Sequence, residues 1–270
     1  MPSFALDSPL PVLCGTVVAL AIALAVGGLL IARRILPAET LDFHHYMTSA
    51  QFQVMGTIYA VLLAFVIITV WQHHSAITNT LEEEAADLLE LRRDAGQYPE
   101  SIGKPLVDAL ESYASAVIDD EWEPMSHGGE SARAEEAYEK VWRLFGKLPV
   151  TDLRELAIQT ETLRRMNDLA ETRHLRLLRA RTTIDPILWI ALLAGAALTI
   201  GFSYLFGARH LGFQILTTAI FAGTIALFIC VIVVLDAPFT RAGSVSREPF
   251  LRALRIMHEG YPSTTVSGER

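Results

Sequence analysis

The sequence predicts an all-α membrane protein with four transmembrane helices in two hairpins and a helical soluble domain inserted between spans two and three. Three observations predict this fold class. Hydrophobic residues make up 51% of the 270 residues and gather toward the two ends of the chain. Four uncharged apolar stretches each approach the ~20 residues that cross a bilayer. The central part carries dense charge and apolar residues at helical spacing, without sustained strand-like alternation.

The first span is expected at about residues 10–31, followed by Arg33 and Arg34. Its apolar run is too long for the core of a signal peptide, and no basic residue precedes it. We therefore expect a retained span. The other spans are expected at about 54–71, 187–206 and 211–235, which gives a first hairpin over 1–73, a soluble domain over 74–185, a second hairpin over 186–240 and a C-terminal tail over 241–270.

The cores of these spans hold no charged residue. Intramembrane charges usually mark proton relays or ion-coupled transport, so the pattern argues against a proton-driven pump. It also argues against an intramembrane enzyme, which would need polar catalytic groups there. The sequence shows no nucleophile–base signature, phosphate-binding glycine loop or metal-ligand spacing, so we expect no enzyme, no cofactor and no metal.

Two cysteines, Cys14 and Cys230, both fall within predicted spans. The sequence implies no disulfide framework. We expect two small apolar side chains packed in helices.

The central segment, residues 74–185, carries the net charge of the chain. It holds 14 Lys and Arg against 23 Asp and Glu, a net charge of −9, whereas the whole chain has −8. Because nucleic-acid binding needs a basic surface, this balance argues against a nucleic-acid partner.

This segment is predicted to be helical throughout. Span two meets no Gly or Pro after Trp71 and is expected to continue as a helix through residues 80–95. Two prolines and a glycine predict a break over 97–105. Further helices are expected at 105–120, with Pro105 in the first turn, at 131–145, closed by Gly146, and at 151–181, capped by Thr151.

An acidic cluster is expected at the C-terminal end of the helix over 105–120. Carboxylates there oppose the helix dipole, so something should offset their charge. The residue types allow a calcium site, a network with arginines of the long helix over 151–181, or a solvated turn. The cluster consists of Asp119, Asp120, Glu121 and Glu123.

Two histidine pairs, His44-His45 and His73-His74, invite a metal interpretation. Adjacent side chains on a helix point about 100° apart, so neither pair converges on one ion. We interpret them as interfacial histidines.

The arginines predict the orientation, because positive residues near span ends favour the cytoplasm. With four spans, the N-terminus, the soluble domain and the C-terminus lie on the same side of the membrane. We expect this side to be the cytoplasm of a bacterium. The chain would then be a multi-pass protein of the inner (plasma) membrane. The arginines before span three could contact lipid headgroups or form an anion vestibule. The runs are Arg173, Arg176, Arg179 and Arg181 before span three and Arg241, Arg247, Arg252 and Arg255 after span four, against Arg33, Arg34 and Arg209 on the other side.

One stripe of span two is polar at its ends and apolar in its middle. Its residues follow one another at alternating spacings of four and three and so share a helix face. In an oligomer this face could line a pore with an apolar constriction, which can gate by dewetting. The alternative is packing within one four-helix bundle. The stripe comprises Gln51, Met55, Ile58, Leu62, Phe65, Thr69 and Gln72.

Short motifs follow one another in a fixed order over nearly the whole chain, beginning with the run over 56–65 in span two. They include Gly56, Tyr59, Trp71, Glu84, Trp122, Trp189, Asp236 and Pro238. These motifs resemble those of the bestrophin-like family of bacterial membrane proteins. One departure follows Phe239, where Gly243 comes later than the family pattern has it.

Bestrophins are oligomeric anion channels whose second membrane helix lines the pore. The resemblance therefore implies a homo-oligomer in the lipid bilayer that passes inorganic anions, with its neck at Ile58, Leu62 and Phe65. A shared fold need not preserve function. The alternative hypothesis is a non-conducting membrane scaffold whose cytoplasmic helical domain binds a partner.

Overall fold

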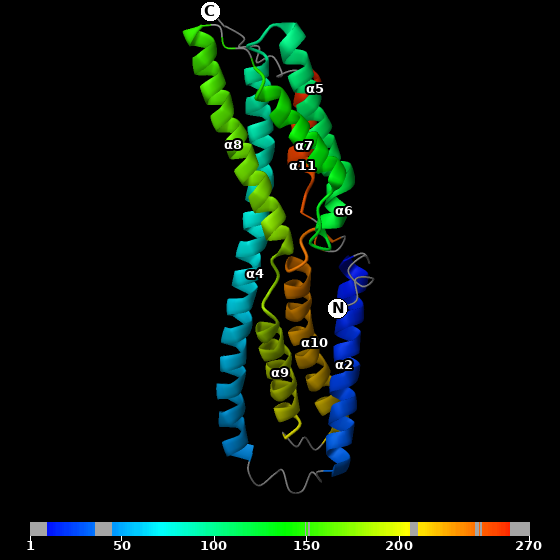
Figure 1. Ribbon diagram of the computed structural model, residues 1–270. Coiled ribbons are helices and arrows are strands. Elements are labelled where there is room, and N and C mark those ends of the chain that lie inside the picture. Colours follow the sequence, from blue (N-terminus) through cyan, green and yellow to red (C-terminus); the bar gives the residue numbers. More distant parts are fainter. Residues whose placement is uncertain are drawn as a thin grey trace, which may run out of the picture. The chain divides into compact units, whose positions relative to one another are not determined.

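The computed structural model describes residues 10–35, 45–148, 150, 152–205, 210–240, 243 and 245–259, with side chains omitted for 45–48. Every secondary-structure element among these residues is a helix (Figure 1). The chain divides into two compact units. The first comprises residues 1–74 and 183–244, and the second comprises residues 75–182 and 245–270.

The first unit contains the four apolar helices. Each has a window long and apolar enough to cross a membrane, so the chain is an integral membrane protein. The helix predicted over 187–206 ends at Ser203, and its predicted boundary at 206 lies outside the described residues. The helices are α2 (Leu10–Ile35), α4 (His45–Ala95), α9 (Pro186–Ser203) and α10 (Leu211–Leu235).

The helix α4 is shared by the two units. Its residues 45–74 belong to the first unit and its residues 75–95 to the second, without interruption of the helix. The absence of Gly and Pro after Trp71 predicted this continuation.

In the first unit the first span packs mainly against the last span. The largest interface of α2 is with α10, the last span, and not with α4 (Figure 1). At this interface Gly223 of α10 lies against Ile22 of α2, where an added Cβ would be 3.3 Å from the Ile22 Cδ1. A small residue there lets the two backbones approach closely. The sequence patterns showed small residues but could not show which helix they face.

A disulfide joins Cys14 of α2 to Cys230 of α10, with the two Cα atoms 5.7 Å apart. The expectation of two unpaired cysteines is therefore wrong. The two helices run antiparallel, which brings the start of α2 beside the end of α10, although the cysteines are 216 residues apart in sequence. Sequence spacing alone gives no sign of such a pairing.

The buried face of α4 packs against α9 and α10. At the closest approach to α9, Gly195 faces Tyr59, and an added Cβ at Gly195 would lie 2.6 Å from the tyrosine ring. Glycine at this position allows the aromatic ring to lie against the α9 backbone. The core combines Tyr59, Leu63, Val66 and Val70 of α4 with Leu192 and Ala196 of α9 and Ile225 and Ile232 of α10.

The second unit contains the end of α4 and shorter helices. Side-chain caps start two of them: Ser131 accepts from the amide of Ala134, and Asp152 accepts from the amide of Glu155. The predicted cap, Thr151, lies outside the described residues. The helices are α5 (Glu100–Ala116), the π-helical turn η2 (Val117–Glu121), α6 (Trp122–Met125), α7 (Ala132–Phe145), α8 (Leu153–Arg181) and α11 (Glu248–Glu259).

The helix α5 begins earlier than predicted. It starts at Glu100, so the break after α4 is shorter than 97–105 and Pro105 lies inside the helix rather than in its first turn. Gly103 explains the early start, because an added Cβ there would meet the Ala95 carbonyl oxygen at 2.5 Å. Only glycine lets the new helix pass so close to the end of α4.

The helix α11 was not predicted, since residues 241–270 were expected to form a tail. It buries Phe250, Ala253 and Met257, which lie at i, i+3 and i+7. Arg92 of α4 donates to the Met257 carbonyl at 3.1 Å and so ties α11 into the second unit.

Candidate pore-lining face and buried charge cluster

The predicted stripe of α4 lies on the exposed face of this helix. Ile58 and Phe65 are 66% and 68% exposed, and Thr69 and Gln72 are also exposed. Leu62 is half-buried at the edge of this face, where it packs against the core. The opposite face of the same helix carries the buried core residues. Span two therefore has one face committed to the fold of its own chain and one face free to contact lipid, water or another copy.

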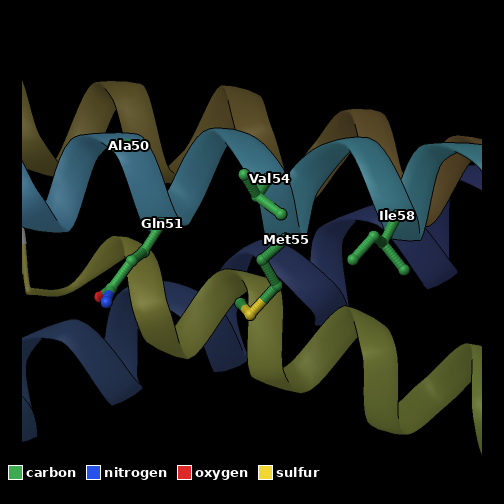
Figure 2. Close-up of a pocket in the computed structure, with 5 residues that line it drawn as sticks. All are labelled: Ala50, Gln51, Val54, Met55 and Ile58. Atoms are coloured by element: carbon green, nitrogen blue, oxygen red, sulfur yellow. The ribbon is translucent and has the colours of Figure 1, made fainter.

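The exposed face is hollowed near the start of α4. A shallow cavity of about 370 Å³ is lined by Ala50, Gln51, Val54, Met55 and Ile58. Figure 2 shows Gln51, Met55 and Ile58 projecting from one side of the helix. All five lining residues belong to α4.

The second unit holds a buried charge cluster around Arg176. The Nε of Arg176 donates to Glu84 at 2.6 Å, and its Nη2 donates to Glu121 at 2.7 Å. All three side chains are fully buried. Arg173 adds a second cation, with its Nη2 3.2 Å from Glu121 and 2.9 Å from Glu135. This cluster connects α4, η2, α7 and α8.

Neutral groups complete the cluster. The hydroxyl of Tyr113 donates to Glu84 at 2.5 Å, and Nη1 of Arg176 lies 3.0 Å from the Met125 sulfur. Burial raises the pKa of Tyr113 well above its usual value, so the phenol stays protonated and remains a donor. Burial alone would lower the pKa of Arg176, but Glu84, Tyr113 and Glu121 raise it well above its usual value. The guanidinium therefore stays charged.

The acidic cluster separates into members with different roles. Glu121 enters the buried cluster, where the π-helical turn η2 positions it, and Asp120 pairs with Arg133 at 2.7 Å. Asp119 and Glu123 are exposed. Among the residues that the structure describes, no group of three or more His, Cys, Asp or Glu could hold a metal ion. The arrangement is thus an arginine–carboxylate network and a solvated turn side by side.

The arginines before span three form contacts within the second unit. Arg173 and Arg176 are buried in ion pairs. Arg179 donates to the Ala76 carbonyl at 2.7 Å and to the Thr80 hydroxyl, while Arg181 lies 3.5 Å from Glu130. Of the arginines expected on the two sides, Arg209 and Arg241 lie outside the described residues.

A second polar contact lies at the end of α10. Asp236 accepts a hydrogen bond from the Ile184 amide at 2.8 Å and another from the Trp189 side chain. Burial raises the pKa of Asp236, while these two bonds and the nearby His73 oppose the rise. The contact fixes the chain where it enters α9.

The remaining motif residues and histidines lie in separate places. Trp122 is buried beneath the guanidinium of Arg247, 5.2 Å from the ring centroid. Pro238 is buried, Gly56 is half-buried, and Trp71 is exposed. His73 and His74 are half-buried, whereas His44 and the side chain of His45 lie outside what the structure describes.

Sequence reasoning offered a network between the acidic cluster and the arginines of the long helix as one of three outcomes, but it did not include Glu84 or Tyr113 in that network. A usable signal was present in α4, where Glu84 interrupts the apolar positions Ile77, Leu81, Leu88 and Leu91 at helical spacing. A charge in such a stripe must be paired when the stripe is buried. The identity of the partner depends on how α4 and α8 pack, which the sequence does not reveal.

Comparison with known proteins identifies the family. Residues 19–250 match the Bestrophin-like domain, so the chain belongs to the Bestrophin-like family. No curated protein matches the chain.

Solved structures share the fold. A mutant of a bacterial bestrophin homolog from Klebsiella pneumoniae is similar with a TM-score of 0.69 and 14% identity, covering 89% of this chain and 97% of that chain. Another mutant of that homolog gives a TM-score of 0.68 at 14% identity, with 89% and 95% covered. A structure described as a membrane protein gives 0.66 at 14% identity, with 89% and 97% covered. The described helices therefore adopt the bestrophin fold.

We predict that Arg176→Met destabilises the protein by about 3–5 kcal/mol, because it leaves Glu84 and Glu121 buried without their cation. Chemical unfolding of the purified protein in detergent, followed by circular dichroism, measures the loss.

The matched control is Arg164→Met, at an exposed arginine of the same helix that pairs with Glu161 and Asp168, each at 2.7 Å. Exposed pairs contribute little, so we expect a loss of less than about 1 kcal/mol. Equal losses in the two variants would contradict a special role for the buried cluster.

Proposed function

We propose that the protein is an oligomeric ion channel that conducts anions through a pore lined by α4. The observation that carries this proposal is the exposed face of α4, where Ile58 and Phe65 are largely exposed while the opposite face is packed. Membership in the Bestrophin-like family and the fold shared with bacterial bestrophin homologs support it.

The proposed pore forms when copies of the chain surround a common axis with their α4 faces turned inward. Ile58, Leu62 and Phe65 then form an apolar neck that excludes water when narrow and passes ions when wide. Thr69 and Gln72 lie toward one mouth, where the amide group of Gln72 can donate hydrogen bonds to a partly dehydrated anion. An uncharged neck of this kind holds an anion weakly enough to release it.

The second unit is the proposed gate. Since α4 continues from the neck into the second unit, the buried cluster at Glu84 anchors the same helix that carries Phe65. Movement of this anchor would be transmitted along α4. The rival hypothesis, a non-conducting scaffold, assigns the second unit to binding a partner and gives the α4 face no aqueous role.

We predict that Phe65→Ala and Leu62→Ala increase protein-dependent halide flux into liposomes, because each shortens a side chain at the neck. The flux is measured with purified protein against protein-free liposomes.

Control variants are Leu198→Ala on α9 and Ile220→Ala on α10, at residues that are also large, apolar and exposed in the chain. We expect both to conduct as the unchanged protein does. Absence of flux in every variant across several pH values would favour the scaffold, and equal increases in neck and control variants would contradict a neck on α4.

We further propose that the protein lies in the bacterial inner membrane with its N-terminus, second unit and C-terminus in the cytoplasm. The basic residues Arg247, Arg252 and Arg255 after span four support this orientation. A cysteine introduced by His258→Cys, at an exposed position of α11, is predicted to react with a membrane-impermeant thiol reagent only after cells are permeabilised. Reaction in intact cells would show that this cysteine lies outside the cell and would contradict the proposed orientation.

A further inference from the structure

Within the second unit, α4 and α8 face each other along a ladder of polar contacts. Glu84 pairs with Arg176 at one end, and the hydroxyl of Thr162 donates to Asp94 at 3.2 Å at the other. Between them the Thr172 hydroxyl lies 3.0 Å from Oδ2 of Asp87. At both ends of this ladder the carboxylate has a cation or several donors, whereas the hydrogen bond described for Asp87 comes from the Thr172 hydroxyl.

Asp87 lies among other carboxylates. Glu84 and Glu90 are one turn away on its own helix, and Asp168 approaches from α8. The arginines near Asp87 are paired with the other carboxylates. Arg164 pairs with Asp168 at 2.7 Å. Arg176 pairs with Glu84 and Glu121. Arg165 forms its ion pairs with Glu90, Asp94 and Glu161.

The position of Thr172 suits both protonation states of Asp87. Its hydroxyl is within 3.1 Å of the carbonyls of Asp168 and Leu169 as well as near Asp87. When Asp87 is ionised, Thr172 can donate to the carboxylate. When Asp87 is protonated, the acid can donate to the Thr172 oxygen while Thr172 donates to its own helix backbone. Each state is thus hydrogen-bonded without rearrangement of the helices.

We propose that Asp87 is a proton-binding switch in the contact between α4 and α8. Protonation removes one negative charge from a group of four carboxylates and tightens the contact. Ionisation restores the repulsion and loosens the contact.

The titration range of Asp87 fits this role. The pKa of Asp87 is raised from 3.8 to about 6, mainly by burial, while Asp168, Glu90 and Glu84 add to the rise and the Thr172 bond opposes it. A raised carboxyl pKa means that the folded protein binds this proton more tightly than the unfolded chain. Its stabilising contribution is complete below the unfolded pKa and is lost as the pH rises through about 6.

The switch could regulate conduction, a consequence that rests on the proposed channel function. Because Asp87 lies on the same uninterrupted helix as Phe65, a tighter or looser hold on α4 would alter the proposed neck. Acidification of the solution that bathes the second unit would then change halide flux.

The direct test compares Asp87→Asn with the unchanged protein in thermal unfolding of the full chain between pH 4 and pH 8. Asparagine keeps the acceptor for Thr172 but cannot ionise, so we expect it to resemble the protonated state at every pH. The melting temperatures should coincide near pH 4, diverge toward pH 6 with the variant the more stable, and differ by a constant amount above that range. Parallel curves over the whole range would overturn the switch.

Neighbouring variants sharpen the test in opposite directions. Thr172→Val removes a donor to the Asp87 carboxylate. The pH above which the melting-temperature difference becomes constant should therefore move higher. Asp168→Asn removes a charge that repels the Asp87 carboxylate, so that pH should move lower. Asp108→Asn changes an exposed carboxyl that pairs with Lys104, so its curve should run parallel to that of the unchanged protein. Shifts in the same direction for the first two variants would contradict the proposal.

Halide flux separates the switch from its consequence. If both proposals hold, flux through the unchanged protein differs between pH 5 and pH 7.5, and Asp87→Asn loses this difference and conducts at both pH values as the unchanged protein does at pH 5. Divergent melting curves without any flux would retain the switch and reject the channel. Flux with the same pH dependence in both proteins would reject the regulatory consequence.

Discussion

The fold of the second unit depends on the burial of Arg176 between Glu84 and Glu121. A buried guanidinium is costly unless carboxylates and further acceptors surround it, and here Tyr113 and Met125 complete the shell. These groups come from distant segments, so the helices can approach only in the arrangement that satisfies them all. Within the second unit, the charge cluster fixes both the rotation and the axial position of the part of α4 that carries Glu84.

In the first unit, one face of α4 is packed against other helices and the opposite face is exposed. Tyr59 and Val66 pack on α9 and α10, while Ile58 and Phe65 remain exposed at the same depth along the helix. The interface of α2 with α10, cross-linked between Cys14 and Cys230, leaves α4 with one side uncovered by its own chain. A channel built from several copies would use this uncovered side, and the packed side would hold it in place.

The sequence predicted the helices better than their partners. Apolar length identified the spans, and the absence of Gly and Pro after Trp71 predicted the long α4. Pairing was harder, because Cys14 and Cys230 approach only through the α2–α10 contact, which local periodicity does not encode. Likewise, Glu121 appeared in an acidic cluster with three open outcomes, and only its distance to Arg176 shows that it is buried. The start of α5 was predicted too late because Pro105 is a strong local signal for a first helical turn. The close approach of Gly103 to the Ala95 carbonyl depends on tertiary packing, which local patterns do not encode.

The central claim is that the exposed α4 face lines an aqueous pore, and cysteine accessibility tests it most directly. In a background with Cys14→Ser and Cys230→Ser, the variants Phe65→Cys and Thr69→Cys would be treated with a charged, water-soluble thiol reagent in halide-loaded liposomes, with Leu198→Cys as the lipid-facing comparison. The account predicts that the reagent modifies the two α4 cysteines and blocks flux, while the α9 cysteine neither reacts nor affects flux. Unreactive α4 cysteines in a conducting protein would contradict it, because the conducting pathway would then lie elsewhere.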